Sequence, residues 1–454
     1  MLKPTDVAIV GMGLTTPLGI GIASNWDGIL SMQTGIQHYP NTHLSEEDYP
    51  RYLQYYGKVQ NVSYPFDIPA KLNSQMKFLN RGSVLGFAAA LDAIADAQGA
   101  SVDMAFNAVK PDRRALYIAT GDFTKVGYDF FYAALKDAHK DTNVQSEKAI
   151  TTRCGIDAGL NYERLNRAAL SKVNPFYLLE SIANNLFSVL SAFTQFMGPN
   201  TTLASQSPCG ALALELAARA IRQGRADVAL AVGCGNWITE IPMYEMAELG
   251  LLSRCSKAGA SFRPFDRHRD GFIPAEGGAA LLLENAQRAQ RRGARIYGLI
   301  RGFGSYVQFA DGASVSVPEQ VILRCMEGAL LDAQCSVDEL SFISPHGSAT
   351  QKGDRSELNS IKTLLKSASL NPPICGLKPY TGHMAAASDI AETIMGILAL
   401  RHGTVPATLN FNKPERGLSG LNIPVTHIPA KGKTFLSVSY GIGGQSSAVI
   451  VEIV

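Results

Sequence analysis

Apolar and polar positions alternate along this chain in a series of elements that occurs twice. Strand-length apolar runs, Val7–Val10 in the first half and Arg295–Ile300 in the second, each end at closely spaced glycines. Helical periodicity then predicts, in each half, a helix that ends in Asp-Ala-Gln, over Phe87–Gln98 and Val321–Gln334. Strands that alternate with amphipathic helices predict α/β layers around a largely parallel sheet.

The series continues in both halves into a helix with a chemically distinctive start. A turn and a helix open on Cys209 in the first half and on His383 in the second. The remaining predicted strands are Ala115–Thr120 and Asp227–Gly235 in the first half, and Leu340–Ser344 and Thr434–Gly444 in the second. Repetition of the whole series predicts a duplicated domain with pseudo-twofold symmetry, with halves at residues 1–285 and 286–454.

One segment, residues 123–173, does not fit the repeat. It is polar, rich in lysine, aspartate and asparagine, and shows helical periodicity over Tyr128–Leu135 and Leu160–Leu170. We interpret it as a lid or a subunit-contact insertion. No low-complexity linker interrupts the chain, so we expect the two halves to pack as one rigid body.

Composition and charge narrow the classes of function. The 454 residues are 46% hydrophobic and 18% charged, as in a soluble α/β enzyme, and the formal charge of +2 argues against nucleic acid or an anionic membrane as the main partner. The seven cysteines are scattered without a Cys-x-x-Cys pair, which argues against a disulfide framework or structural zinc. We see neither a signal peptide nor an apolar run long enough to span a membrane, so we expect a soluble cytoplasmic protein.

Cys209 lies where a polar turn, Ser-Gln-Ser-Pro, runs into an apolar helix. At a helix N-terminus a thiol faces unpaired backbone N–H groups and the positive end of the helix dipole, and both lower its pKa. We therefore expect Cys209 to form a reactive thiolate. The other cysteines lack this position and are interpreted as inert core residues: Cys154, Cys234, Cys255, Cys325, Cys335 and Cys375.

His346 follows a predicted strand and precedes a Gly-Ser-Ala-Thr turn, the kind of position where α/β sheets place active groups. Asp354 and Glu357, three residues apart, share one helical face, and we expect them to anchor this loop. The alternative is a metal site formed by His346, Asp354 and Glu357. It is disfavoured because the spacing matches no standard ligand pattern.

His383 opens the second distinctive helix, and Lys378 lies five residues before it. A cation beside an imidazole lowers the imidazole pKa, and a neutral histidine can both accept a proton and donate a hydrogen bond. If this Gly-His motif stood alone, it would favour a structural histidine that is buried or caps a helix. A cysteine with two histidines elsewhere in the chain instead indicates a nucleophile and its acid–base partners.

A glycine turn, Gly441-Ile442-Gly443-Gly444, follows the last predicted strand but one. Glycines there permit close backbone approach to a ligand, and exposed N–H groups can stabilise an oxyanion. Dinucleotide binding is disfavoured, because no helix with a suitably spaced acidic residue follows, and Gly11-Met12-Gly13 is equally unconvincing as a dinucleotide loop.

Taken together, these motifs resemble the β-ketoacyl-acyl carrier protein synthases (ketosynthases) of the thiolase fold, almost end to end. The resemblance includes the opening Val-Ala-Ile-Val-Gly-Met-Gly-Leu-Thr-Thr-Pro-Leu-Gly, the His-Gly-Ser-Ala-Thr, Lys-x-x-x-Gly-His and Gly-Ile-Gly-Gly stretches, and the segments Arg263-Pro264-Phe265-Asp266, Arg269-Asp270-Gly271-Phe272 and Glu276-Gly277. It implies an α/β fold with the duplicated five-layer αβαβα architecture of the thiolases. It also implies an acyltransferase whose cysteine is acylated and whose two histidines assist decarboxylation of a malonyl thioester and condensation of the resulting carbanion.

The resemblance assigns roles to individual residues of this chain. It implies Cys209 as the nucleophile, His346 and His383 as the catalytic pair, and Lys378 as a support for their electrostatics. Backbone N–H groups of Cys209 and Ile442 would form the oxyanion hole. The remaining implied assignments are the phosphopantetheine-binding residues Ser348 and Thr350 and the carrier-protein docking residues Lys71, Lys77 and Arg81. The implied partners are acyl carrier protein and a second subunit, either identical or a chain-length factor, with no bound cofactor and no metal.

Several positions depart from the family's pattern and bear on the substrate. Pro208 and Gly210 flank the nucleophile where Ala and Ser are usual. Ile442 stands in place of a gating phenylalanine, and Ala386–Asp389 replaces a Gly-Ala-Ala-Gly run. Residues 123–173 form a longer insertion than in the housekeeping enzymes. We therefore favour a specialised type II polyketide or unusual fatty-acid pathway over bulk lipid synthesis.

Three other functions remain open. A chain-length-factor-like partner subunit typically lacks the cysteine, so Cys209 counts against it. A non-decarboxylating acyltransferase would use Cys209 to move an acyl group onto an alcohol or amine, and the presence of both histidines counts against it. A degradative thiolase is the third.

Overall fold

The computed structural model describes residues 2–40, 50–98, 108–121, 162–172, 185–205, 207–308 and 319–454. Contacts within the chain divide it into two units, one formed by Met1–Asp122 with Ala183–Val454 and the other by Phe123–Ile182. The helix described in the second unit is α5 (Tyr162–Lys172). It overlaps the helix predicted over Leu160–Leu170, whereas the helix predicted over Tyr128–Leu135 lies outside the described residues.

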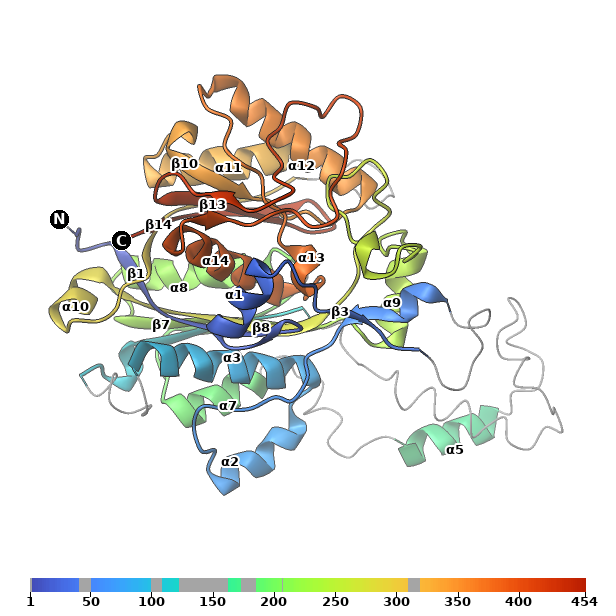
Figure 1. Ribbon diagram of the computed structural model, residues 1–454. Coiled ribbons are helices and arrows are strands. Elements are labelled where there is room, and N and C mark those ends of the chain that lie inside the picture. Colours follow the sequence, from blue (N-terminus) through green and yellow to red (C-terminus); the bar gives the residue numbers. More distant parts are fainter. Residues whose placement is uncertain are drawn as a thin grey trace. The chain divides into compact units, whose positions relative to one another are not determined.

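The first unit is built of five layers (Figure 1). Helices α3 (Arg81–Gln98) and α7 (Asn185–Thr194) cover the outer face of one layer of strands. Helices α11 (Glu319–Ala333) and α12 (Gln351–Leu364) cover the outer face of the other layer.

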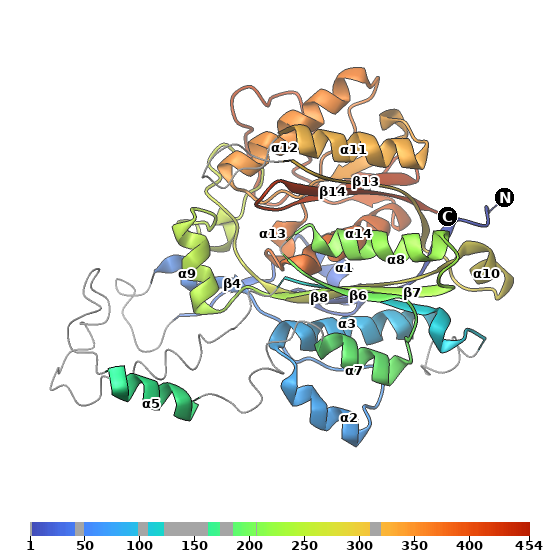
Figure 2. The ribbon, with the colours of Figure 1, turned by 180° about the vertical axis from the view of Figure 1, so that it is seen from behind.

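Two helices lie between the two layers of strands, as the view from behind also shows (Figure 2). They are α8 (Cys209–Arg222), which contacts β7 below it, and α14 (Ala386–Arg401), which contacts strands of both layers. The αβαβα order implied by the family resemblance is therefore confirmed.

The strands form one hydrogen-bonded path that doubles back to make both layers. The path runs β10-β13-β14-β9-β1-β8-β7-β5-β6, with β2 beside β1. Pairing of Val7–Ile9 on β1 with Gly298–Ile300 on β9 joins the two layers. The bounds are β1 (Val7–Thr16), β2 (Gly19–Ile20), β5 (Arg114–Thr120), β6 (Asn200–Ala204), β7 (Val228–Asn236), β8 (Glu276–Asn285), β9 (Gly298–Val307), β10 (Leu340–Ser344), β13 (Thr434–Tyr440) and β14 (Gln445–Ile453).

Smaller elements connect and flank these layers. Two short two-stranded sheets pair β3 with β4 and β11 with β12. The remaining bounds are β3 (Ile36–His38), β4 (Tyr55–Gly57), β11 (Thr404–Val405), β12 (Ile428–Pro429), α1 (Ile22–Leu30), α2 (Ala70–Gln75), α9 (Glu240–Glu248), α10 (Ala286–Arg291), α13 (Lys378–Thr381) and the 3₁₀ helices Arg51–Leu53, Met76–Phe78, Pro111–Arg113, Ala258–Ser261, Val337–Glu339 and Leu365–Ser367. No described helix is long and apolar enough to cross a membrane.

The prediction of a largely parallel sheet is wrong. Parallel pairing joins β5 to β6, β5 to β7 and β10 to β13, but the other pairs along the path are antiparallel. The glycine turn Gly441–Gly444 illustrates the cause, because so short a connection between β13 and β14 can join only antiparallel strands. Hydrophobic periodicity reports which residues are buried and carries no information on strand direction.

Paired glycines bring a helix against a strand in the same way in both halves. A Cβ atom on Gly11 of β1 would lie 2.1 Å from the carbonyl oxygen of Ala93 on α3. A Cβ atom on Gly304 of β9 would lie 2.0 Å from the carbonyl oxygen of Cys325 on α11. Only glycine permits so close a backbone approach, so these glycines serve helix–strand packing.

A hydrogen bond beside these glycines also occurs twice. The N–H of Met12 donates to Asp96 over 2.9 Å, and the N–H of Phe303 donates to Asp332 over 3.0 Å. Both aspartates belong to the Asp-Ala-Gln endings of the predicted helices. The two halves therefore repeat individual contacts as well as element order, while their boundary at residue 285 stays a prediction.

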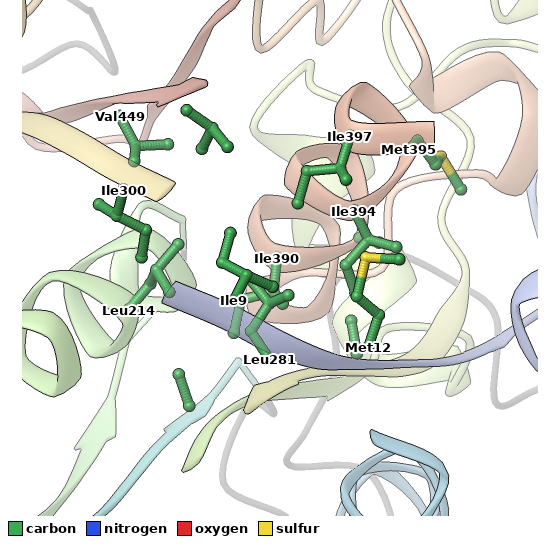
Figure 3. Packing of buried hydrophobic residues seen from close by; sticks show 14 of the residues in the cluster. Ile9, Met12, Leu214, Leu281, Ile300, Ile390, Ile394, Met395, Ile397 and Val449 are labelled. Carbon is green, nitrogen blue, oxygen red and sulfur yellow. The ribbon is translucent and has the colours of Figure 1, made fainter. Parts of the chain in front are cut away.

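Buried apolar side chains fill the space between the two strand layers (Figure 3). Of the 16 residues of α14, 15 are buried, so other parts of the protein surround this helix on all of its faces. The labelled members of this cluster are Ile9, Met12, Leu214, Leu281, Ile300, Ile390, Ile394, Met395, Ile397 and Val449. This packing holds the N-termini of α8 and α14 at fixed positions inside the molecule.

Candidate active site

Cys209 is the first residue of α8, at the helix start that the sequence predicted. Its side chain is buried, and its thiol donates a hydrogen bond to the carbonyl oxygen of Ser205 over 2.8 Å. A Cβ atom on Gly441 would lie 1.8 Å from the carbonyl oxygen of Ser207. The glycine turn that contains Ile442 is therefore in backbone contact with the turn that presents the cysteine.

The thiol is not activated in the way that the sequence suggested. Burial raises the pKa of the Cys209 thiol, and the negative charge of Asp389 raises it further. Asp389 also accepts hydrogen bonds from the N–H groups of Gly210 (3.0 Å) and Ala211 (3.4 Å), which were expected to stabilise a thiolate. The expectation of a resting thiolate is therefore wrong, and the neutral thiol needs a base.

His346 and His383 are buried together. Their ring centroids are 5.2 Å apart in an edge-to-face arrangement. Burial lowers the pKa of both imidazoles well below the usual value, and the positive charge of Lys378 lowers it further, so both are neutral. Among the described residues neither Nδ1 atom has a hydrogen-bond partner. The protein therefore leaves both rings able to accept or donate a proton.

His383 lies three residues before α14 and does not open the helix as predicted. Its N–H donates to the carbonyl oxygen of Ile273 and its own carbonyl oxygen accepts from Ala275, each over 2.9 Å. The ring packs against Trp237 and Phe272, with centroids 4.7 and 4.9 Å away. Backbone bonds and aromatic contacts thus hold this histidine without a helical turn.

Lys378 joins the two histidine motifs. Its ammonium group donates to the carbonyl oxygen of His346 over 2.7 Å and to both carboxylate oxygens of Glu392 over 2.8 and 2.9 Å. Lys378 and Glu392 are both buried, and burial raises the pKa of Glu392 to about 7, against the lowering effect of Lys378. The sequence reasoning missed Glu392, although acidic residues in an otherwise apolar helix signal buried partners for a cation.

Asp354 and Glu357 lie under the His346 loop, as expected from their shared helical face. Glu357 accepts the N–H groups of His346 (2.7 Å) and Gly347 (2.9 Å), and Asp354 accepts that of Ala349 (2.9 Å). Burial raises the pKa of Glu357 to about 8 and that of Asp354 to about 6. Since N–H donors occupy both oxygens of Glu357, these contacts argue against the metal alternative, and the described residues contain no cluster suited to a metal ion.

Ser348 and Thr350 belong to a cluster of three hydroxyl groups. The oxygen of Ser348 lies 2.8 Å from that of Thr350 and 3.1 Å from that of Tyr440. A Cβ atom on Gly353 would lie 2.4 Å from the Tyr440 oxygen and 2.5 Å from the Thr350 oxygen, so only glycine leaves room for the cluster. The Tyr440 ring also packs 4.3 Å from that of His346. Sequence reasoning missed Tyr440, since a tyrosine at a strand end carries no signal of its partners.

The three residues predicted to dock a carrier protein differ in their surroundings. Lys71, on α2, and Lys77, in the 3₁₀ helix that follows, are exposed, and the Lys77 ammonium lies 5.0 Å from the Phe78 ring. Arg81 instead donates to both oxygens of the buried carboxylate of Glu276 over 2.8 and 3.0 Å, and to the carbonyl oxygen of Val59. We therefore remove Arg81 from the docking proposal, because its guanidinium holds the fold.

Known proteins with related sequences cover nearly the whole chain. The profile described as "Beta-ketoacyl synthase, N-terminal domain" matches residues 5–101 and 89–289, and that of the C-terminal domain matches residues 297–412. The chain is 26% identical over 460 residues to 3-oxoacyl-[acyl-carrier-protein] synthase 2 of Vibrio cholerae, covering 98% of both chains. It is 27% identical over 450 residues to the tetracenomycin polyketide synthase ketoacyl synthase alpha subunit of Streptomyces glaucescens, covering 98% of this chain and 96% of the relative.

Solved structures share the fold over the full length. The ishigamide ketosynthase/chain length factor matches with a TM-score of 0.79 at 21% identity, covering 100% of both chains. A type II polyketide synthase acyl-carrier protein in complex with its ketosynthase bound to the hexaketide matches with a TM-score of 0.77 at 24% identity, again over 100% of both chains.

A cysteine at the start of a buried helix and a pair of buried neutral histidines, held in a five-layer αβαβα frame, define a condensing enzyme of the thiolase fold. Such an enzyme is an acyltransferase. The chain belongs to the β-ketoacyl synthase family.

Proposed function

We propose that this protein catalyses decarboxylative Claisen condensation of an acyl thioester with malonyl-acyl carrier protein, in a type II polyketide or unusual fatty-acid pathway. The observation that carries the proposal is the pair of buried, neutral histidines tied to Lys378 and Glu392. The protein contributes no bound cofactor to this chemistry, because the substrates arrive on the phosphopantetheine arm of the carrier protein.

In the first half-reaction the sulfur of Cys209 attacks the carbonyl carbon of the acyl thioester. The thiol is neutral, so its proton must pass to a base, and the two neutral histidines are the candidates in this site. The tetrahedral oxyanion is stabilised by the N–H groups of Cys209 and Ile442. Its collapse forms the Cys209 acyl thioester, and the phosphopantetheine thiol leaves with the proton.

In the second half-reaction the malonyl group loses carbon dioxide, and the electron pair of the broken bond passes into an enolate. A neutral imidazole carries one N–H donor, so His346 and His383 together can place two donors on the enolate oxygen. The enolate carbon then attacks the Cys209 thioester, a carbon–carbon bond forms, and the cysteine sulfur leaves as a thiolate that takes a proton from solvent. Lys378 stays fixed between Glu392 and the His346 carbonyl throughout.

The partner that we propose is an acyl carrier protein, whose acidic surface would be attracted by Lys71 and Lys77. Ser348 and Thr350 would hold the phosphopantetheine arm, and Tyr440 fixes their hydroxyl groups. A second subunit, either identical or a chain-length factor, completes the proposed assembly. Residues 123–173 are the proposed insertion for lid closure or subunit contact.

Mass spectrometry on the purified protein tests the function. The protein is incubated with a panel of acyl carrier proteins bearing acyl groups, and then with malonyl-acyl carrier protein. We expect a covalent acyl adduct on Cys209, followed by release of carbon dioxide and a product two carbons longer. An adduct that is transferred to an alcohol or amine without release of carbon dioxide would support the acyltransferase alternative, and no adduct with any substrate would contradict catalysis by Cys209.

A further inference from the structure

Asp389 is a buried carboxylate at the point where the two central helices meet. Asp389 lies in the first turn of α14 and is only 1% exposed to solvent. It accepts hydrogen bonds from the N–H groups of Gly210 (3.0 Å) and Ala211 (3.4 Å), and from the hydroxyl of Ser207 (3.0 Å). One side chain from α14 therefore holds the turn before Cys209 and the first N–H groups after it.

Two departures from the family's pattern, Gly210 and Asp389, are complementary in space. A Cβ atom on Gly210 would lie 3.0 Å from Oδ2 of Asp389, and only 2.1 Å from the carbonyl oxygen of Ala386. The start of α14 thus occupies the volume into which a side chain at position 210 would project. The Asp389 carboxylate then takes the place of any local side-chain cap, and no side-chain cap bond is formed at Pro208, the N-cap residue of α8.

The charge of Asp389 opposes ionisation of Cys209. A helix N-terminus ordinarily stabilises a thiolate through its N–H groups and its positive potential. Here a carboxylate accepts two of those N–H groups and brings a negative charge of its own to the N-terminus of α8, where it raises the pKa of Cys209 beyond the effect of burial.

The other groups around Asp389 do not cancel this charge. The hydroxyls of Ser207 and Ser439 donate to it, and both are uncharged. Burial raises the pKa of Asp389, and the positive charge of Lys378 on α13 lowers it. The Lys378 ammonium is itself bonded to both oxygens of Glu392, one turn further along α14, so it is already paired with another carboxylate. The two histidines of the site are neutral and add no positive charge.

We propose that Asp389 is a positioning residue that caps α8 and keeps Cys209 as a neutral thiol, so that the nucleophile reacts only when a base in the site removes its proton. This inference rests on the proposed role of Cys209. It gives the site a means of sparing the thiol from electrophiles that are not its substrate, because the thiolate is the reactive form.

Alkylation of Cys209 by iodoacetamide tests the inference without any substrate. The rate is measured across a pH series by peptide mass spectrometry, which separates Cys209 from the other cysteines. Asp389→Asn keeps an oxygen acceptor and removes the charge. Asp92→Asn is the matched control, because the carboxylate of Asp92 on α3 also accepts a backbone N–H, that of Leu14 over 3.2 Å, and because burial raises the pKa of both carboxylates.

We expect Asp389→Asn to move the midpoint of the alkylation profile to lower pH and to raise the rate at neutral pH by on the order of tenfold. The alkylation profile of Cys209 in Asp92→Asn should have the same midpoint as in the intact protein. An unchanged or higher midpoint in Asp389→Asn would overturn the inference, since it would show that the carboxylate only caps the helix. If Asp389→Asn does not fold, the alkylation profile of the intact protein provides the test. A midpoint for Cys209 below the ordinary cysteine value of about 8.5 would also overturn the inference.

These outcomes are separable from those of the proposed function. Alkylation reports ionisation of the thiol whether or not the protein condenses acyl groups. A protein that shows the predicted shift and forms no acyl adduct would contradict the function and leave the role of Asp389 supported.

Discussion

The ammonium group of Lys378 donates a hydrogen bond to the carbonyl oxygen of His346 over 2.7 Å. This bond connects the segment before His383 to the loop that carries His346. Glu392 completes the arrangement by binding the same ammonium group with both oxygens. A single buried ion pair therefore ties the two histidine motifs together, while burial and then the positive charge of Lys378 lower the pKa of both imidazoles.

The first prediction concerns this ion pair. Because Glu392→Gln leaves Lys378 as an unpaired buried charge, we expect the variant to lose about 3–5 kcal/mol of unfolding free energy. Replacing both residues, as Lys378→Met with Glu392→Leu, should recover most of that stability, since no buried charge remains. Denaturant unfolding of the intact protein, the single variant and the double variant measures this. Equal stability of Glu392→Gln and the intact protein would contradict the pairing.

The second prediction concerns Tyr440. Tyr440→Phe removes the hydroxyl that lies 3.1 Å from Ser348 and leaves the ring against His346. Loss of a hydrogen bond worth about 1 kcal/mol should raise KM for carrier-protein substrates roughly fivefold and leave kcat little changed. Tyr380→Phe is the control, because its hydroxyl also bonds a partner, the carbonyl oxygen of Ala407. A fall in kcat without a change in KM would place Tyr440 in the chemistry and contradict a role in holding the arm.

The third prediction concerns carrier-protein docking. Reversing Lys71 and Lys77 to glutamate should raise KM for carrier-protein substrates, because an acidic partner would then be repelled, and should leave small thioester analogues unaffected. The effect should shrink at high salt, where exposed charges are screened. The control is the same reversal at Lys431 and Lys433, which are also exposed. Equal effects on both kinds of substrate would count against docking at this surface.

The fourth prediction concerns chain selection. Isoleucine is shorter than phenylalanine and β-branched, so we expect Ile442 to leave more room beside Cys209 and to gate the site less sharply. Ile442→Phe should reduce turnover of bulky or polyunsaturated chains relative to short saturated ones by about 1–3 kcal/mol in activation free energy, the range for overpacking a filled site. Competition assays with both kinds of acyl carrier protein measure the shift. An unchanged product distribution would mean that pocket size is set elsewhere.

The sequence was sufficient for the parts of the fold that leave a local pattern. The start of α8 at Cys209 follows from a polar turn before an apolar run, and the bounds of β10 follow from its buried strand pattern. Strand direction was predicted wrongly, because it depends on connections and not on burial. The repeated bonds of Met12 with Asp96 and Phe303 with Asp332 could not be foreseen, since each joins residues far apart in the chain.

In the candidate site, too, some features could be predicted from the sequence and others could not. The motifs around Cys209, His346 and His383 could be found because each contains an unusual residue beside a turn. Their electrostatics could not, because burial raises the thiol pKa and Asp389 raises it further, and Asp389 lies 180 positions away in the sequence in space that Gly210 leaves open. Arg81 looked like a surface cation for a similar reason: its partner Glu276 is remote in sequence.

The most direct test of the account separates acylation from condensation by intact-mass analysis. Cys209→Ala, His346→Ala and His383→Ala are each incubated with acyl carrier protein and then with malonyl-acyl carrier protein. We predict no acyl adduct on Cys209→Ala, and adducts on both histidine variants whose condensation is slowed by about 10²–10⁴-fold, the usual worth of a general acid–base group. Full acylation of Cys209→Ala, or normal condensation by both histidine variants, would contradict the account.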